Sequence, residues 1–203
     1  MQTKAEYDLI ADQWCSIRTE LPSNDVELFE LFLSYLPDNS HVLDLGCGHG
    51  TPVADLISSH GHNILGIDRS EKLLSIAKSK FPQHSWQQSD LEKYQPTQQF
   101  DGIVIWDSMF HLPRQEHAIL LNKAYQSLKY KGALILSSGG SKYDIPPFTG
   151  SMFNNEFFYD SFTIKQLLDV CEEIGLRVVQ TKLVNEPDGG RDKGRLGVVL
   201  RKI

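Results

Sequence analysis

Short hydrophobic runs alternate with amphipathic stretches along most of the chain. Apolar runs bounded by polar or turn residues predict buried strands, over residues 42–45, 63–67, 84–88, 100–106, 133–137, 176–184 and 196–203. Apolar residues at helical spacing predict helices over residues 3–18, 22–36, 53–59, 71–80, 114–130 and 163–175. Strands that alternate with helices favour a parallel sheet covered by helices on both faces.

The last two predicted strands break the parallel pattern. They are joined by residues 185–195, too few for a crossover helix, so they must pair antiparallel. The helix before them begins at a capping box, Thr163 to Gln166, and ends at Gly175. The expected fold is therefore an α/β three-layer sandwich, with a mostly parallel seven-stranded sheet that ends in an antiparallel hairpin.

Two regions lie outside this alternation. In residues 1–37 the first helix places Tyr7, Trp14 and Arg18 on one face. That face either packs on the sheet edge or forms a ligand lid, because aromatic rings attract cations and arginine pairs with carboxylates. Residues 139–160 are polar and glycine-rich but carry six aromatic residues, which argues against disorder. We interpret this segment as a loop that walls a ligand pocket; local aromatic packing is the alternative.

Composition limits the possible partners. The chain has 203 residues, of which 40% are hydrophobic and 23% charged, as in a globular domain with a substantial core. The formal net charge of −6 disfavours nucleic acid. A mild basic cluster is predicted to be solvated surface and comprises Arg191, Lys193, Arg195, Arg201 and Lys202.

The expected location is the cytoplasm. Residues 1–10 lack the apolar core of a signal peptide, and no run approaches the roughly 20 apolar residues of a membrane span. Cys15, Cys47 and Cys171 form no C-x-x-C pair, which suggests a reducing compartment. The histidines lack a common ligand spacing, so no metal site is predicted.

The strongest local signal is Val-Leu-Asp-Leu-Gly-Cys-Gly-His-Gly over residues 42–50, between a predicted strand and a predicted helix. Glycine at 46, 48 and 50 permits positive φ and close backbone approach, and the next helix points its free N–H groups at the loop. A dinucleotide fold would need G-x-G-x-x-G. Here the spacing is G-x-G-x-G, and Asp44 precedes it. That carboxylate opposes a pyrophosphate but suits a ligand that carries an ammonium and a sulfonium.

A second carboxylate supports a nucleoside ligand. Asp68 ends the second predicted strand 22 residues after Gly46, the length of one strand–helix–strand unit. In this position a carboxylate can accept hydrogen bonds from both ribose hydroxyls.

Residues 42–50 resemble the first motif of class I S-adenosylmethionine-dependent methyltransferases, whose consensus is close to V-L-D-[LV]-G-C-G-x-G. The Phe-Asp strand at residues 100–106, the His111-Leu112-Pro113 segment and the terminal hairpin are similar to the same family, so the resemblance covers about residues 41–203. It implies a Rossmann-like fold, S-adenosylmethionine as methyl donor and S-adenosylhomocysteine as product.

The resemblance also implies site residues. The expected donor contacts are Tyr7, Trp14, Arg18, Asp44, Gly46, Cys47, Gly48, Asp68, Arg69, Asp90, Leu91 and Trp106. Asp90 would accept from the adenine amine with Leu91 beside it, and Trp106 would end the fourth strand against the donor methyl. No Asn-Pro-Pro-Tyr sequence begins there, which argues against nucleobase or protein acceptors and favours a small molecule or metabolite.

His111 and Asp107 are the expected catalytic residues, with Tyr159 as a further candidate base. His111 is favoured because histidine titrates near neutrality; a histidine bonded to backbone at a helix start is the alternative. The expected single methyltransferase domain, 1–203, comprises an N-terminal helical lid (1–37), a cofactor-binding core (41–138), an acceptor-pocket loop (139–160) and a C-terminal helix and hairpin (161–203). A nicotinamide-dependent oxidoreductase and a catalytically silent cofactor-binding subunit stay open as alternatives.

Overall fold

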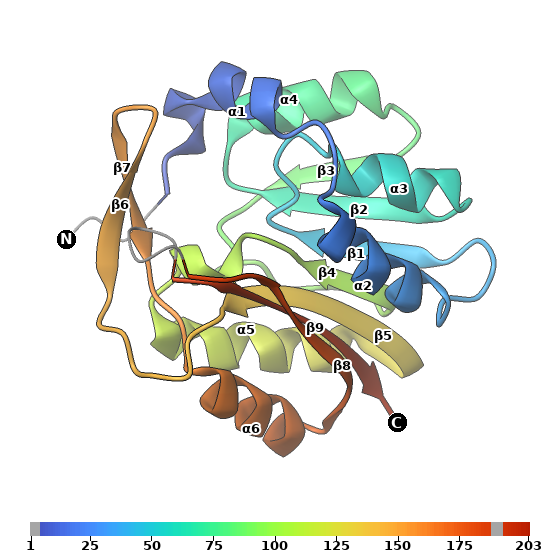
Figure 1. Cartoon of the computed structure of the whole chain (residues 1–203). Coiled ribbons are helices and arrows are strands. Elements are labelled where there is room, and N and C mark those ends of the chain that lie inside the picture. Colours follow the sequence, from blue (N-terminus) through green and yellow to red (C-terminus); the bar gives the residue numbers. More distant parts are fainter. Residues whose placement is uncertain (1–4, 188–192) are drawn as a thin grey trace.

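A seven-stranded sheet forms the middle layer of the computed structural model, which describes residues 5–187 and 193–203 (Figure 1). The strand order is β3-β2-β1-β4-β5-β9-β8. The strands are β1 (His41–Leu45), β2 (Asn63–Asp68), β3 (Ser85–Gln88), β4 (Phe100–Ile105), β5 (Leu128–Gly139), β8 (Leu176–Asn185) and β9 (Arg195–Lys202). Strands β1 to β5 pair parallel, whereas β9 runs antiparallel to both β5 and β8. The predicted Rossmann-like sheet with its terminal antiparallel hairpin is confirmed.

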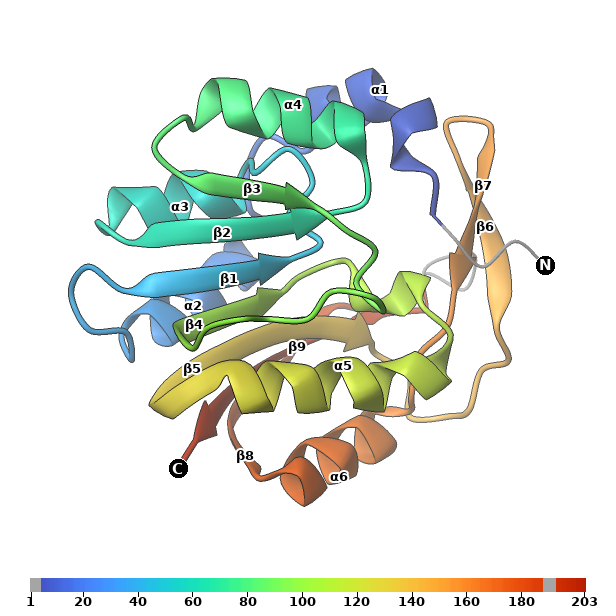
Figure 2. The same ribbon diagram turned by 180° about the vertical axis from the view of Figure 1, so that it is seen from behind.

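Helices cover both faces of this sheet. Helices α2 (Ser23–Leu33) and α3 (Val53–Ser59) lie on one face, and α5 (Arg114–Ser127) and α6 (Ile164–Ile174) on the other (Figure 2). Helix α4 (Glu71–Lys80) packs against β3 and β2 at the sheet edge. Over residues 5–187 and 193–203, no helix combines the length and apolar character needed to cross a bilayer.

Each face has its own apolar core, because successive strand residues point to opposite sides of the sheet. Val42 packs in the cluster beneath α2 and α3, whereas its neighbour Leu43 packs in the cluster beneath α5 and α6. Both side chains are fully buried. Complete burial of such a side chain stabilises the fold by about 1.5–3 kcal/mol.

Local sequence signals set several helix boundaries. Ser70 caps α4, its hydroxyl accepting from the backbone N–H of Leu73. Thr163 and Gln166 form the predicted reciprocal capping box of α6. Gly175 ends α6 at φ +102°, a left-handed conformation that favours glycine.

Two helix predictions are wrong in part. Helix α5 ends at Ser127 rather than at residue 130, and β5 begins at Leu128, because Leu128 pairs with Phe100 of β4. The predicted helix over residues 3–18 is, within its described part, a 3₁₀ turn η1 (Tyr7–Leu9) followed by α1 (Ala11–Ile17). Ile10 breaks it at φ −126°, where its buried side chain packs with Phe157.

Residues 139–160 are not the irregular loop that we expected. They contain a separate hairpin, β6 (Phe148–Met152) and β7 (Asn155–Tyr159), whose turn residues Phe153 and Asn154 both have positive φ. The hairpin projects beyond the main sheet near the N-terminal segment (Figure 2). The aromatic residues that gave no strand pattern along the chain pack against neighbouring segments, with Phe157 against Tyr7 and Tyr159 against Phe110.

Replacing Thr163 with alanine removes the hydroxyl that accepts from the Gln166 N–H at 3.2 Å, while the reciprocal bond from the Thr163 backbone N–H to Gln166 Oε1 can remain. We expect Thr163→Ala to lower the free energy of unfolding by about 1 kcal/mol, as for other caps. Urea denaturation measures the loss. Lys165→Ala in the first turn of the same helix is the control, since Lys165 makes only an exposed i,i+4 ion pair and should cost much less. Equal losses in the two variants would contradict the capping role.

Candidate functional site

A cleft of about 920 Å³, which includes space open to solvent, lies where β1, β2 and β4 end. The carboxyl ends of neighbouring parallel strands form the common binding crevice of open α/β sheets. Asp44 of β1, Asp68 of β2 and Asp107 after β4 all line this cleft. The fold thus brings three carboxylates from distant parts of the sequence to one site.

The glycine loop after β1 requires glycine for steric reasons. Gly46, Gly48 and Gly50 have φ of +88°, +56° and +86°. A Cβ atom on Gly46 would come within 2.2 Å of the Ser108 side chain. The loop therefore lies close against the segment after β4 and borders the cleft with its backbone.

Asp68 braces this loop. One carboxylate oxygen accepts from the N–H of Gly48 at 2.8 Å, and the other accepts from the N–H of Ser70 at 2.8 Å. Burial raises the pKa of Asp68, and these backbone donors counter the shift in part. Asp68, the carboxylate predicted to bind a nucleoside, thus lies in the cleft and joins the glycine loop to α4.

Asp44 is the one buried carboxylate of the described cleft with an oxygen left unsatisfied. Its side chain is 2% exposed, and Oδ2 has no hydrogen-bond partner within the described chain. Burial, with a smaller effect of Asp68, raises the pKa of Asp44 to about 8. A buried carboxyl without a partner favours a cation beside it, and the cleft gives a ligand access to this position.

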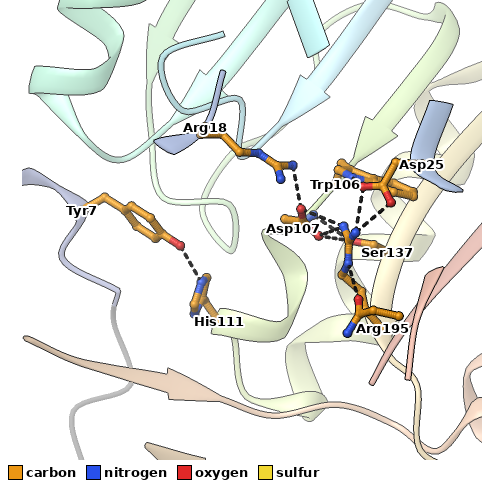
Figure 3. Close-up of polar contacts among 9 residues, drawn as sticks. Tyr7, Arg18, Asp25, Trp106, Asp107, His111, Ser137 and Arg195 are labelled. Atoms are coloured by element: carbon orange, nitrogen blue, oxygen red, sulfur yellow. Dashed lines mark hydrogen bonds and ion pairs between the residues drawn. The ribbon is translucent and has the colours of Figure 1, made fainter. Parts of the chain in front are cut away.

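Asp107 is held by two arginines (Figure 3). Arg18 Nη2 donates to Oδ2 at 2.7 Å, and Arg195 Nη1 lies 2.7 and 2.9 Å from Oδ1 and Oδ2. Ser137 adds a hydroxyl bond to Oδ1 at 2.9 Å. Burial alone would raise the pKa of Asp107, but the two guanidinium groups hold it below the ordinary value. A carboxylate bonded in this way is a poor proton acceptor, which argues against the predicted role of Asp107 as a base.

His111 does not titrate near neutrality, so the reason for choosing it as a base is wrong. Its Nδ1 lies 2.8 Å from the carbonyl oxygen of Phe158 and its Nε2 lies 3.0 Å from the hydroxyl of Tyr7. Burial lowers its pKa to about 4. A neutral imidazole that donates from Nδ1 and accepts at Nε2 satisfies both contacts. This arrangement matches the alternative given for His111 in the sequence analysis, a histidine hydrogen-bonded to the backbone.

The predicted N-terminal face assembles although its helix is broken. The rings of Tyr7 and Trp14 meet edge to face at 5.2 Å, and the Arg18 guanidinium lies 6.0 Å from the Trp14 ring. All three residues line the cleft.

Of the other predicted donor contacts, some line the cleft and one does not. Cys47, Arg69 and Leu91 line the cleft. The carboxylate of Asp90 lies outside the lining and pairs instead with Arg69 at 3.5 Å and Lys93 at 2.9 Å. Trp106 borders the cleft, but its indole N–H donates to Asp25 at 3.2 Å and its ring packs on Phe29 of α2.

Sequence reasoning missed Arg195 and Asp25. Arg195 belongs to the basic cluster predicted to be solvated surface, yet its side chain is only 17% exposed and ion-pairs with Asp25 and Asp107. Asp25, in an amphipathic helix, is completely buried. The prediction for Arg195 is therefore wrong, because the partners that bury it lie 88 and 170 residues away.

A second cavity of about 1000 Å³, which also includes space open to solvent, adjoins the cleft and shares Tyr7, Trp14, Arg18, Asp107 and His111 with it. Aromatic rings from the β6–β7 hairpin and η2 (Met109–His111) form one wall, where Tyr159 stacks on Phe110 at 5.9 Å and on Phe148 at 5.3 Å. The arrangement is a pair of adjoining compartments, one edged by glycine backbone and carboxylates and the other by aromatic rings.

The described residues offer no cluster of three histidine, cysteine, aspartate or glutamate side chains that could hold a metal ion.

Known proteins match this chain. Residues 42–132 match the family described as "Methyltransferase domain". Trans-aconitate 2-methyltransferase of Azoarcus sp. is 34% identical over 112 residues, 55% of this chain and 43% of that protein. Ubiquinone biosynthesis O-methyltransferase of Coxiella burnetii is 30% identical over 120 residues, 55% of this chain and 51% of that protein. The chain spans about half the length of these curated relatives.

Solved structures share the fold at low sequence identity. A SAM-dependent methyltransferase from Methanosarcina mazei has a TM-score of 0.72 at 18% identity, covering 85% of this chain and 97% of that chain. The 1,6-didemethyltoxoflavin-N1-methyltransferase of Burkholderia thailandensis, with 1,6-didemethyltoxoflavin and S-adenosylhomocysteine bound, has a TM-score of 0.71 at 18% identity, covering 97% of this chain and 83% of that chain.

The raised pKa of Asp44 predicts a pH dependence of stability. Between its ordinary pKa of 3.8 and about 8, the folded ligand-free protein binds one proton that the unfolded chain has lost. Stability should therefore fall as pH rises through this window, by up to about 1.4 kcal/mol per pH unit. Asp44→Asn should flatten this slope, as measured by thermal melts at pH 4.5–8.

Asp101→Asn is the matched control for this slope. Burial would raise the pKa of Asp101, but the His41 N–H and Lys129 hold it below the ordinary value, so its contribution is lost only as pH falls below about 4. We expect Asp101→Asn to lower stability while keeping the wild-type slope above pH 4.5. A wild-type slope in Asp44→Asn would contradict the assignment to Asp44.

Proposed function

We propose that this chain, which belongs to the class I S-adenosylmethionine-dependent methyltransferases, transfers a methyl group from S-adenosylmethionine to a small-molecule acceptor and releases S-adenosylhomocysteine. The observation that carries the proposal is Asp44, a buried carboxyl whose free oxygen borders a cleft edged by glycine backbone. Family membership, and relatives named for methyl transfer to trans-aconitate and in ubiquinone biosynthesis, support the same reaction.

The residues of the cleft fit the chemical groups of this donor. Asp44 would pair with its ammonium, and Arg18 would bind its carboxylate. Asp68 would accept from the ribose hydroxyls. Arg69 and Leu91 would border the adenine, with the Asp90 carboxylate acting on Arg69 rather than on the base. Tyr7 and Trp14 would present aromatic rings to the sulfonium.

The second cavity is our candidate for the acceptor pocket. It adjoins the donor cleft, and the stacked rings of Phe110, Tyr159 and Phe148 would suit a flat, partly apolar molecule. The carboxylates of this cavity are already neutralised by arginines, Asp107 by Arg18 and Arg195 and Asp160 by Arg114. The cavity is therefore poorly suited to a cationic acceptor. The hairpin would thus supply the acceptor wall and residues 5–18 the boundary between the compartments.

Positioning carries most of the proposed catalysis. A sulfonium methyl is already a strong electrophile, so the protein mainly has to align the acceptor for in-line attack. Alignment supplies about 7–11 kcal/mol in favourable intramolecular models. The bonded states of Asp107 and His111 favour positioning roles for both, and Tyr159 is the remaining predicted base that lines the cavity.

A nicotinamide-dependent oxidoreductase gains no support from the matched family or from the relatives named above. A catalytically silent subunit is separated by the turnover assay below. The cytoplasmic location stays a prediction from the sequence.

Donor binding tests the proposal first. We expect the wild-type protein to bind S-adenosylhomocysteine in isothermal titration, and Asp68→Ala to weaken binding at least tenfold, since hydrogen bonds to a charged group contribute about 1.5–3 kcal/mol. Asp55→Asn in the exposed ion pair with Lys80 is the control and should bind like the wild type. A wild-type protein that binds NAD but not S-adenosylhomocysteine would overturn the assignment.

The acceptor cavity is tested by Phe148→Ala, which removes a ring that borders only the second compartment among the two described above. We expect S-adenosylhomocysteine affinity within twofold of wild type but methyl transfer reduced about tenfold. Turnover is followed as transfer of labelled methyl from S-adenosylmethionine to a fractionated small-metabolite extract. Wild-type transfer to protein or nucleic acid instead of small molecules would refute the substrate class, and binding without any transfer would favour the silent subunit.

A further inference from the structure

Four alternating charges connect α2 and β9 to the N-terminal segment. In order they are Asp25, Arg195, Asp107 and Arg18 (Figure 3). The row begins at a fully buried carboxylate and ends at a guanidinium that borders both compartments. It thus runs from α2 through β9 and the segment after β4 to Arg18, which lines the cleft.

Arg195 has every nitrogen engaged within the protein. Its Nη2 lies 2.8 Å from both oxygens of Asp25, its Nη1 bonds both oxygens of Asp107, and its Nε donates to Asn185 at 3.1 Å. The guanidinium also lies 5.5 Å from the Trp106 ring. Although Arg195 borders the second cavity, this geometry leaves it nothing to offer a ligand directly.

Arg18 is in the opposite situation. Its Nη2 donates to Asp107 at 2.7 Å, but within the described chain neither Nε nor Nη1 has a hydrogen-bond partner. The side chain is 19% exposed and borders the cleft. One corner of this guanidinium is therefore fixed, and its other N–H groups remain for a carboxylate.

The sharing of Asp107 decides how strongly Arg18 can attract an anion. If Arg18 were the sole partner of Asp107, that buried carboxylate would cancel its charge and compete for its donors. Arg195 takes a bond to each oxygen of Asp107, so the negative charge is divided between two cations. Asp25 in turn neutralises Arg195 and accepts from the Trp106 indole, which anchors the row to α2.

We infer that Arg195 and Asp25 are positioning residues for methyl-donor binding: through Asp107 they hold Arg18 oriented and available for the carboxylate of the donor. The inference rests on the proposed function, because it assumes that Arg18 meets that carboxylate. Neither residue lies in a motif that the family resemblance assigned, and neither is expected to touch the donor.

The test compares two ligands that differ at the amino-acid end. S-adenosylhomocysteine carries the carboxylate, whereas 5′-methylthioadenosine keeps the nucleoside and thioether but lacks both carboxylate and ammonium. Isothermal titration of both ligands is carried out on wild type, Arg195→Gln, Arg195→Lys and the control Arg201→Gln, which changes an arginine of the same strand that bonds Lys131 away from the cleft.

We expect Arg195→Gln to weaken S-adenosylhomocysteine about tenfold and to leave 5′-methylthioadenosine within twofold of wild type. Arg195→Lys should recover part of the loss, and Arg201→Gln should match the wild type with both ligands. Because Arg195→Gln leaves Asp25 buried without its partner, the uncharged pair Asp25→Asn/Arg195→Gln is measured in parallel and should show the same selective loss.

Equal weakening of both ligands in these variants would indicate a general structural role and overturn the inference, as would unchanged S-adenosylhomocysteine affinity. A wild-type protein that binds neither ligand would instead refute the proposed function. The two failures are therefore distinguishable.

Discussion

The site is built on the burial of three carboxylates at one edge of a parallel sheet. Parallel strands bring their carboxyl ends together, so Asp44, Asp68 and Asp107 meet in one cleft although they lie far apart in sequence. Burial disfavours the charge on each of them. Each carboxylate has a different set of hydrogen-bond partners, and these partners determine where the neighbouring segments lie.

The three carboxylates differ in their partners: backbone N–H groups bind Asp68, arginines bind Asp107, and one oxygen of Asp44 has no partner within the described chain. Asp68 is satisfied by N–H groups of the glycine loop and α4, which fixes the loop on α4. Asp107 is satisfied by Arg18 and Arg195, which ties the N-terminal segment to the terminal hairpin. Asp44 keeps one oxygen without a partner, so it is the carboxylate left for a cationic ligand.

Features encoded within a few residues were predictable from the sequence. The capping box at Thr163 and the glycine loop after β1 depend on neighbouring atoms, and both lie where the pattern predicted them. The short final connection likewise determines that the last two strands pair antiparallel. Asp68 was predictable because the length of one strand–helix–strand unit fixes its place.

Features that depend on distant partners were not predictable. Leu128 continues a helical pattern but pairs with Phe100, so β5 begins where a helix was expected to continue. Arg195 resembles any surface arginine until Asp25 and Asp107 are placed beside it. His111 was chosen for its ordinary pKa, which its burial lowers to about 4. Side-chain chemistry alone gave the residue types of the site, whereas burial determined their charge states.

The row of four alternating charges from Asp25 to Arg18 matters more for the orientation of its side chains than for the stability of the fold. A buried ion pair offsets its own desolvation cost only in part, so its presence is weak evidence of stabilisation. Its bonds are directional, however, and a carboxylate whose two oxygens both lie within hydrogen-bond distance of one guanidinium nitrogen is restricted in its orientation. The N-terminal segment has independent anchors in Asp8 on α4 and Ile10 beside Phe157. Because those contacts hold the segment, the ion pairs that lead to Arg195 serve mainly to orient Arg18. Arg18 and Asp107 line both compartments, so the same ion pairs also fix part of the boundary between them.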